Sequence, residues 1–327
     1  MMKKIIIFGA TGDVGKYLVD DCIQYFKDQY EIVAVGTRQT SLFEKYHIKY
    51  IRVDISDENA FSKLPVDDVH AVVHLAGLLP AYMKEYSPLR YIDVNLKGTL
   101  NILEYCRKNN VDRILYSQSY SDLAGYINEG PVLEPYMPRK LKYTGDHAVY
   151  SITKCAAVDL IEHYHQEYHL KNFIFRLPNI YMYMPNEYYC VDGVPRKIAY
   201  RYMINRALKG LPIELWGDPE KSKDIVYVKD LCQMFCKATD TQSVNSGVYN
   251  VGTGVRTNML QQIDGIIKVF SPKDNPSEIV YCPDKPDCVD FVMDIGNAET
   301  ELGYTPQYDY ISYLEDYKKE MLLNRFV

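Results

Sequence analysis

Long apolar runs and blocks of like charge are both missing from this sequence of 327 residues. No stretch reaches the length of about 18 apolar residues that a bilayer-spanning helix needs, and the first residues run straight into a strand pattern rather than into a cleavable leader. The formal net charge of −6 is spread along the chain. We therefore expect a cytoplasmic protein that has neither a nucleic acid nor a membrane as its partner.

The eight cysteines contain no Cys-x-x-Cys pair, the spacing that would indicate a metal or redox site. Cys232 and Cys236 are four residues apart, on one face of an expected helix, where such residues usually serve packing. We expect free thiols and no metal. The chain also lacks internal repeats and low-complexity segments, although three prolines between residues 126 and 147 predict an irregular loop.

A glycine-rich turn stands near the start of the chain. The apolar run 3–8 precedes Gly9-Ala10-Thr11-Gly12-Asp13-Val14-Gly15, and an amphipathic run from residue 15 to 27 follows. Gly9 permits a sharp turn, Gly12 lets the backbone approach a pyrophosphate, and Gly15 lets the helix pack closely on the strand. Free N–H groups at the helix start attract phosphates. The pattern predicts a strand, a turn and a helix that bind a dinucleotide.

A second motif supplies a candidate for proton transfer. Tyr150 and Lys154 are four residues apart and so lie on one face of a helix. A tyrosine of pKa about 10 is a poor acid or base at neutral pH, and an ammonium group beside it lowers that pKa. Upstream, the run 113–119 reads as a strand that ends in hydroxyls. The Ser119 hydroxyl could donate to the substrate oxygen that Tyr150 also contacts.

The glycine turn and the Ser119, Tyr150 and Lys154 set together resemble the extended short-chain dehydrogenase/reductase family, which contains the nucleotide-sugar epimerases and dehydratases. The resemblance covers nearly the whole chain. It implies that Tyr150 is the catalytic acid/base, that Lys154 lowers its pKa and binds the cofactor ribose, and that Ser119 orients the substrate. Other landmarks similar to the family's follow in order: Asp54-Ile55 as the adenine contact, Leu75-Ala76-Gly77 as the loop over the cofactor, Asn95 as a structural asparagine, and Pro178-Asn179 in the substrate and nicotinamide loop.

The pattern of apolar residues predicts an α/β fold. Short β-branched runs alternate with helical segments up to residue 178, as in parallel β-α-β units wound on both faces of one sheet. We predict a Rossmann-type, doubly wound parallel sheet in residues 1–178 and a smaller substrate-binding lobe in 179–327, with some chain crossing back to the first domain. The expected strands are 3–8, 31–36, 48–53, 69–75, 111–117 and 172–177, and a helix is expected at about 198–209.

The end of the second expected strand bears on the cofactor. An acidic residue there holds the ribose 2′-hydroxyl of NAD, whereas a basic residue accommodates the 2′-phosphate of NADP. This chain has Thr37 and Arg38 at that place and no acid. The sequence therefore favours NADP(H), while NAD(H) remains possible.

The residues after Ser119 narrow the reaction. Family dehydratases generally carry an Asp-Glu pair there, whereas this chain has Tyr120-Ser121-Asp122, and we interpret Asp122 as a solvated turn residue. What remains is a nucleotide-sugar 4-epimerase, which oxidises the sugar to its 4-keto form and reduces it from the other face, or an NADPH-dependent reductase of a keto sugar or small carbonyl compound. A catalytically inactive cofactor-binding regulatory protein is a third alternative, against which the intact Ser119, Tyr150 and Lys154 argue.

A nucleotide sugar needs cations for its diphosphate. Lys223 stands where many relatives have an arginine, and the other candidates are Arg196, Lys197, Arg201 and Arg256. This basic set is thinner than the family's, which keeps the small-carbonyl reductase open. The helices expected around 88–109 and 148–169 are where family members commonly pair, so the resemblance also implies a homodimer.

Overall fold

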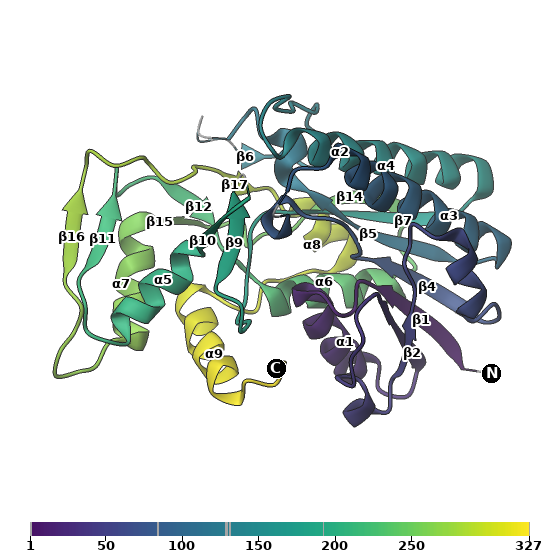
Figure 1. The fold of residues 1–327 in the computed structure, drawn as a ribbon, viewed down its shortest axis with the longest axis horizontal. Coiled ribbons are helices and arrows are strands. Elements are labelled where there is room, and N and C mark those ends of the chain that lie inside the picture. The colour runs from purple at the N-terminus through teal and green to yellow at the C-terminus, as the bar shows by residue number, and fades with distance from the viewer. Residues whose placement is uncertain (1, 84, 128–129, 131, 192, 327) are drawn as a thin grey trace.

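The computed structural model describes residues 2–83, 85–127, 130, 132–191 and 193–326. At its centre is a parallel sheet of seven strands in the order β14-β7-β5-β4-β1-β2-β3, with helices on both faces (Figure 1). The six predicted strands are all present, with ends within two residues of those expected, so the predicted doubly wound fold is confirmed. The strands are β1 (Lys3–Phe8), β2 (Tyr30–Gly36), β3 (Lys49–Arg52), β4 (Val69–His74), β5 (Arg113–Ser119), β7 (Lys171–Leu177) and β14 (Ser246–Asn250).

Two hydrophobic cores lie on the two faces of this sheet. Successive side chains of a strand point to opposite faces, so Ile5 and Ile7 join one core and Ile6 and Phe8 the other. Both faces are therefore covered, which explains why these strands read as continuous apolar runs. The first face is covered by α1 (Asp13–Phe26) and α6 (Val228–Asp240), and the second by α3 (Gly98–Lys108) and α4 (Ala148–Tyr168).

The strand order reverses between β1 and β4. From β1 the chain moves outward to β2 and β3, then returns to β4 on the other side of β1 and continues to β5. The connections that follow β1 and β4 consequently diverge and leave a crevice at the carboxyl ends of these strands, which is where ligands bind in open α/β sheets. The glycine-rich turn follows β1 directly and so lies at this crevice.

The C-terminal part of the chain forms a lobe of short paired strands and helices at one end of the sheet (Figure 1). The chain also returns to the sheet, because α6 packs on α1 and β14 pairs in parallel with β7. Between residues 126 and 147 the described residues contain only the short strand β6 (Val132–Leu133). The remaining elements are β8 (Ile180–Tyr181), β9 (Tyr188–Val191), β10 (Val194–Lys197), α5 (Ala199–Ala207), β11 (Ile213–Trp216), β12 (Ser222–Asp224), β13 (Val226–Tyr227), β15 (Arg256–Asn258), α7 (Met259–Phe270), β16 (Ile279–Cys282), β17 (Val292–Met293), α8 (Gly296–Leu302) and α9 (Tyr310–Leu323).

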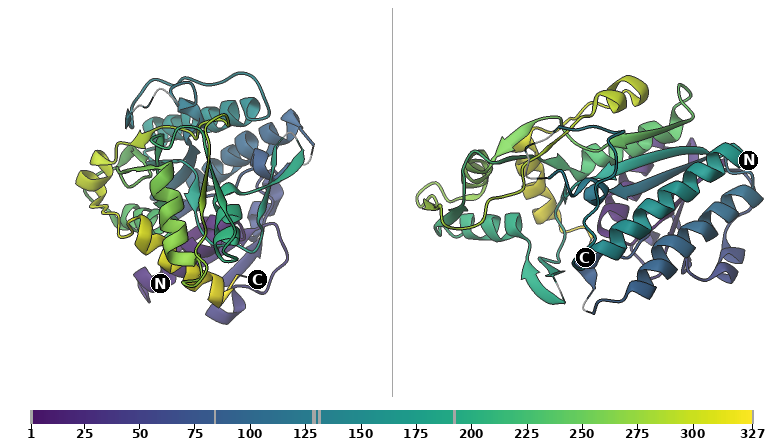
Figure 2. Two further views of the ribbon diagram at one scale, coloured as in Figure 1. Left: turned by 90° about the vertical axis from the view of Figure 1, so that its left-hand side faces the viewer. Right: turned by 90° about the horizontal axis from the view of Figure 1, so that it is seen from above.

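Two helical segments directly precede α3. The predicted segment 88–109 is α2 (Pro88–Tyr91), a π-helical turn η4 (Ile92–Lys97) and α3 in direct succession. Seen from above, α3 and α4 run side by side (Figure 2). No helix in the described part of the chain is long and apolar enough to cross a membrane.

Candidate active site

The turn after β1 is built from positions that exclude side chains. Gly9 has a positive φ of 84°, and a Cβ there would lie 2.7 Å from the backbone nitrogen of Ala76. A Cβ on Gly15 would overlap the carbonyl oxygen of Gly9. Thr11 is buried, and its hydroxyl oxygen would lie only 2.7 Å from a Cβ on Gly36. The turn therefore brings the start of α1 close to β1, with free helix N–H groups facing the crevice.

The residues that follow β2 and β3 form one edge of the crevice. Thr37 and Arg38 are exposed, and the Arg38 carbonyl accepts a hydrogen bond of 2.5 Å from the Tyr50 hydroxyl. Arg52, which our sequence interpretation did not single out, donates from Nε to the Thr37 carbonyl at 3.3 Å. Its place at the end of β3, paired in register with Gly36, is the signal that could have identified it.

Asp54 and Ile55 continue from β3. The Asp54 carboxylate is exposed and accepts hydrogen bonds from the backbone N–H and hydroxyl of Ser56, at 3.0 and 2.7 Å. Ile55 is buried, and its side chain lies against Gly98 at the start of α3. Ile55 therefore fixes the loop to the helix, while Asp54 remains open to the crevice edge.

The loop after β4 is held by a buried amide. Leu75 and Ala76 are half-buried and Gly77 is exposed. The Asn95 side chain accepts a hydrogen bond from the Leu78 N–H at 2.7 Å and donates one to the Leu78 carbonyl at 3.1 Å. This two-point contact fixes the loop beside the glycine turn, since Ala76 lies directly against Gly9.

Tyr150 and Ser119 meet at the carboxyl end of β5. Burial raises the pKa of Tyr150 to about 12, and a hydrogen bond with the Ser119 side chain acts against this rise. Ser119 is oriented from both sides, since its hydroxyl accepts a hydrogen bond from the Ser121 N–H at 3.2 Å and its own N–H donates to the Gln118 side chain at 3.0 Å. Gln118 is thus a positioning residue that the motif search missed.

Lys154 is adjacent to this pair but directed elsewhere. Its ammonium donates to the Ser117 carbonyl at 2.5 Å and lies 4.0 Å from the ring centroid of Tyr116. Burial lowers the pKa of Lys154 to about 7. The Tyr150 pKa is set by burial, Ser119 and Tyr120, and Lys154 is not among its determinants. In this arrangement two other groups attract the ammonium, and the role of Lys154 in lowering the pKa of Tyr150 stays a prediction.

Asp122 is not the solvated turn residue that its sequence context indicated. It is buried, and its two carboxylate oxygens each accept a 3.0 Å hydrogen bond from Nε of Arg176. Arg176 also donates to the Pro135 carbonyl at 2.8 Å, and the Asp122 carbonyl accepts from the Lys140 N–H at 2.8 Å. The ion pair therefore ties the segment that leads to Tyr150 onto the sheet, and it leaves Asp122 unavailable as a second acid or base.

Among the predicted substrate cations, Lys223 interacts electrostatically with Tyr120, the residue that follows Ser119. It is half-buried in β12, with its ammonium 5.6 Å from the ring centroid of Tyr181. Burial acts to lower the pKa of Lys223, but neighbouring groups that include Tyr181 and Tyr120 outweigh it, and the pKa is raised. Lys223 therefore presents a stable positive charge beside Tyr120, the residue that follows Ser119.

The other cations are dispersed. Arg201 is buried and donates to the Met184 carbonyl and to Glu187, so its guanidinium is already engaged within the lobe. Arg256 pairs with Asp290 at 2.9 Å. Arg196 is exposed on β10, and Asn179 is exposed directly after the buried Pro178. The structure thus brings Ser119, Tyr150 and Lys223 toward one region but leaves Arg196 and Arg256 on separate elements.

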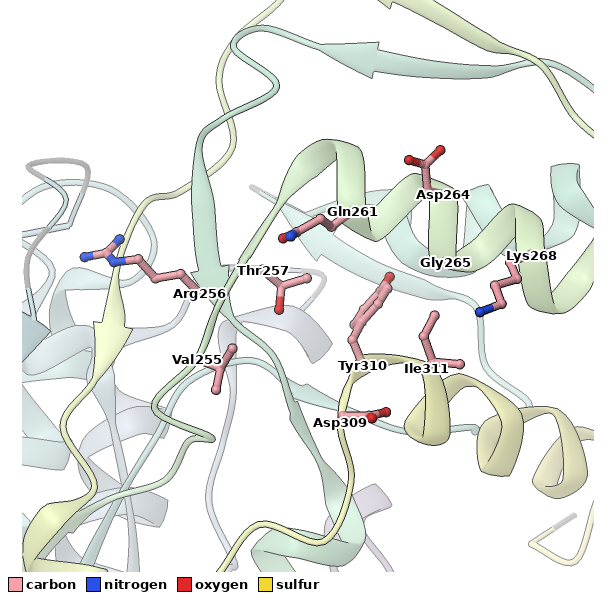
Figure 3. Close-up of a pocket in the computed structure, with 10 residues that line it drawn as sticks. All are labelled: Val255, Arg256, Thr257, Gln261, Asp264, Gly265, Lys268, Asp309, Tyr310 and Ile311. Carbon is pink, nitrogen blue, oxygen red and sulfur yellow. The ribbon is translucent and has the colours of Figure 1, made fainter.

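A cavity of about 360 Å³ lies beside Tyr150, bounded by Pro80, Met83, Tyr86, Tyr91, Gly145, Asp146 and Gly193. Tyr91 packs against Tyr150 with ring centroids 6.1 Å apart. A larger and more open pocket of about 470 Å³ lies on the lobe, among β15, α7 and α9 (Figure 3). There the Arg256 guanidinium points away from Tyr310 and Lys268, so this pocket does not gather positive charge.

Among the described residues, neither the cysteines nor the side chains that could bind a metal form a further candidate site. Cys232 and Cys236 are buried in the core on α6, and the sulfur of Cys236 lies 3.7 Å from that of Cys22 on α1. In the described ranges, no group of three or more His, Cys, Asp or Glu side chains could hold a metal ion.

Comparison with known proteins assigns the chain to a family. Residues 5–252 match the profile of the NAD dependent epimerase/dehydratase family. The chain belongs to this family. It is therefore an enzyme of a family that uses a nicotinamide cofactor, and the side-chain-free turn at Gly9 before α1 is suited to such a cofactor.

Individual relatives are distant but extend over the whole chain. The UDP-glucose 4-epimerase of Caenorhabditis elegans is 24% identical, over 92% of this chain and 92% of that protein. Two solved structures share the fold. One is the UDP-glucose 4-epimerase of Thermotoga maritima with UDP-glucose, with a TM-score of 0.75, 23% identity and coverage of 98% and 99% of the two chains. The other is the UDP-N-acetylglucosamine 4-epimerase of Methanobrevibacter ruminantium, with a TM-score of 0.78, 20% identity and coverage of 98% of each chain.

Proposed function

We propose that this enzyme is a 4-epimerase of nucleotide sugars, and that the nucleotide is uridine diphosphate. The observation that carries the proposal is the buried Tyr150 phenol with Ser119 beside it at the carboxyl end of β5, two strands from the glycine turn. The buried ion pair of Asp122 supports epimerisation over dehydration, because elimination of water needs a further acid and base near Ser119. The choice of uridine rests on the UDP sugars named for the relatives.

The proposed chemistry divides between the pair and Lys154. A bound nicotinamide cofactor would accept a hydride from the sugar carbon and return it. Tyr150 moves the proton of the C4 hydroxyl, and the Ser119 hydroxyl holds the same oxygen. A phenol whose pKa is raised to about 12 is protonated at neutral pH and can donate its proton to a 4-keto oxygen. The phenolate left by that step is the base that takes the C4 hydroxyl proton when the sugar is oxidised. Lys154 uses one N–H on Ser117 and has two further donors for the cofactor ribose.

The retained nucleotide tests the class of reaction. An epimerase returns its cofactor to the starting state in each cycle, so we expect purified protein to release about one nicotinamide nucleotide per chain only after heat denaturation. A cofactor that exchanges freely as NADPH would instead favour the reductase of a keto sugar or small carbonyl compound. The reductase draws support from the dispersed cations, since Arg201 is buried and Arg256 is paired with Asp290.

The substrate class is tested by ligand-induced stabilisation. With saturating cofactor, we expect UDP sugars to raise the melting temperature more than GDP, CDP or dTDP sugars, because a ligand at 100 times its Kd stabilises by about 2.7 kcal/mol. Lys223→Met should weaken this shift, and Lys268→Met, on the separate lobe pocket, should not. Silence with all four nucleotide classes would overturn the assignment.

We also infer a preference for NADP(H) from Arg38, with Thr37 beside it at the end of β2. Arg38→Ala should weaken NADPH binding by roughly 1.5–3 kcal/mol, the value of a charge-assisted hydrogen bond, and leave NADH binding nearly unchanged. Equilibrium titration of both coenzymes measures this. A wild-type enzyme that binds NADH more tightly, or an equal loss for both coenzymes, would contradict the inference.

A further inference from the structure

A hydrogen bond joins the two connections that flank the crevice. The Tyr82 hydroxyl lies 2.5 Å from Oδ2 of Asp13. Asp13 is the first residue of α1, immediately after the glycine turn that follows β1. Tyr82 ends the 3-10 helix η3 (Pro80–Tyr82) in the connection that follows β4. Because β1 and β4 are the strands between which the sheet order reverses, this bond spans the mouth of the crevice where a dinucleotide lies.

Both ends of the span are fixed. On the β4 side, Leu78 is held by Asn95, and Pro80 and Met83 are buried on either side of the exposed Tyr82 ring. From the lobe, β9 packs against η3. The β1 side is fixed by α1 itself. Tyr82 is therefore held in place by the residues around it, and its hydroxyl forms a bridge to Asp13.

The chemistry of Asp13 gives the bridge a purpose. A carboxylate at a helix N-terminus that also receives a pyrophosphate would repel that anion unless its charge were directed elsewhere. The phenol of Tyr82 donates a hydrogen bond to this carboxylate, and this bond partly offsets its negative charge. A bound dinucleotide would thus lie between the glycine turn below and the bridge above.

We propose that the Tyr82–Asp13 hydrogen bond is a clasp that closes over the cofactor pyrophosphate and slows its release. The clasp rests on the proposed function, since an epimerase must keep its cofactor through repeated cycles. The bond must open for exchange, so its loss should raise the dissociation rate more than it changes the association rate.

The first test measures cofactor release directly. NADPH-loaded protein is mixed with excess NADP⁺, which occupies each site that NADPH leaves. The loss of protein-bound NADPH fluorescence then gives the release rate. Tyr82→Phe keeps the ring and removes the hydroxyl, and we expect release to become about tenfold faster, the scale of one charge-assisted hydrogen bond at a partly exposed site. Tyr25→Phe is the matched control, because Tyr25 is similarly exposed (48% against 52% for Tyr82) and lies at the far end of α1, the helix that begins with Asp13. Its release rate should equal that of the wild type.

A double-mutant cycle separates the clasp from a direct role of Asp13. If the two side chains act only through each other, then Tyr82→Phe, Asp13→Ala and the double variant should all accelerate release by the same factor. Asp13→Asn, whose amide oxygen still accepts from the phenol, should release slowly. Unchanged release in Tyr82→Phe, or effects that multiply in the double variant, would overturn the clasp. A wild-type protein that binds no nicotinamide nucleotide would instead overturn the dinucleotide site, and the clasp with it.

Discussion

At the scale of single residues, the phenol of Tyr150 carries the proposed chemistry. Tyr150→Phe should lower turnover by about 100-fold or more, the usual loss when a general acid or base is removed, while fold and bound cofactor persist. The ring itself stays packed against Tyr91, so the cavity wall is preserved. Steady-state assays and the nucleotide content of the purified variant measure the two quantities. Turnover near that of the wild type would rule out Tyr150 as the acid/base.

Lys154 should leave a trace in the pH dependence of stability. Its pKa is lowered from 10.5 to about 7 by burial, so between these values the unfolded chain binds a proton that the folded chain does not. Stability of the wild type relative to Lys154→Met should therefore rise as the pH increases from 7 toward 10. Urea unfolding of the cofactor-free proteins at pH 7 and pH 9.5 measures this difference. If the difference in the free energy of unfolding between wild type and Lys154→Met were the same at both pH values, Lys154 would keep its proton in the folded protein.

Asp122 offers a stability prediction. Removing one partner of a buried ion pair leaves an uncompensated charge, so Asp122→Ala should lower the free energy of unfolding by about 3–5 kcal/mol through Arg176. Asp159→Ala is the control, because its pair with Arg139 is exposed and worth about 1 kcal/mol or less. Urea unfolding compares the two. Equal losses would mean that burial of the Asp122 pair has no energetic consequence.

These residues also show where sequence reasoning ends. Gly9 and Gly15 could be interpreted because their constraints are local to one turn. The partner of Asp122 lies 54 residues away, and the acceptor of Lys154 lies 37 residues away on another strand. Side-chain direction in a crevice depends on such partners, and spacing within one helix does not reveal it.

At the scale of elements, the end of α9 fastens the lobe to the cofactor helix α1. The Phe326 ring lies 4.6 Å from that of Tyr17, and Lys16 donates to the Phe326 carbonyl at 3.2 Å. Arg325 pairs with both Asp20 of α1 and Glu320 of α9. The same helix that receives the pyrophosphate is thus tied to the lobe that would bind the sugar.

We expect Phe326→Ala to lower the free energy of unfolding by about 3 kcal/mol, since it empties a buried aromatic site between two elements. Leu323→Ala, three residues earlier and 64% exposed, should change it by less than about 0.5 kcal/mol. Urea denaturation followed by circular dichroism measures both. If both variants changed the free energy of unfolding by a similarly small amount, the contact of this segment with α1 would not contribute to stability.

The elements themselves were largely predictable, whereas their assembly was not. Buried parallel strands and amphipathic helices can be recognised by their apolar pattern, so β1 to β5, β7 and α1 could be placed within two residues. β14 could not, because Ser246–Asn250 is short and only half-buried at its start, and its place depends on pairing with β7. Pairing partners far apart in sequence leave no local signature.

At the scale of the whole molecule, an apolar surface crosses the helices on one face of the sheet. Leu89 on α2, Ile92 on η4, Leu100 on α3 and Ile152 on α4 are exposed by 72%, 44%, 38% and 43%, on elements that lie in contact. Exposed apolar side chains gathered in this way indicate an interface. The expected homodimer would bury them, with α3 and α4 of each chain, which lie side by side (Figure 2), forming a four-helix contact.

We therefore predict that the wild type sediments as a dimer and that the double variant Leu100→Asp, Ile152→Asp sediments as a monomer, because two carboxylates per chain would have to be desolvated in the contact. Leu322→Asp, on the 83% exposed position of α9, should remain dimeric. Sedimentation velocity at micromolar concentration distinguishes the states. A monomeric wild type would contradict the interface. A dimeric double variant would place the contact on another face. In that case α4, which carries Tyr150 and Lys154, would be held in place only by contacts within its own chain.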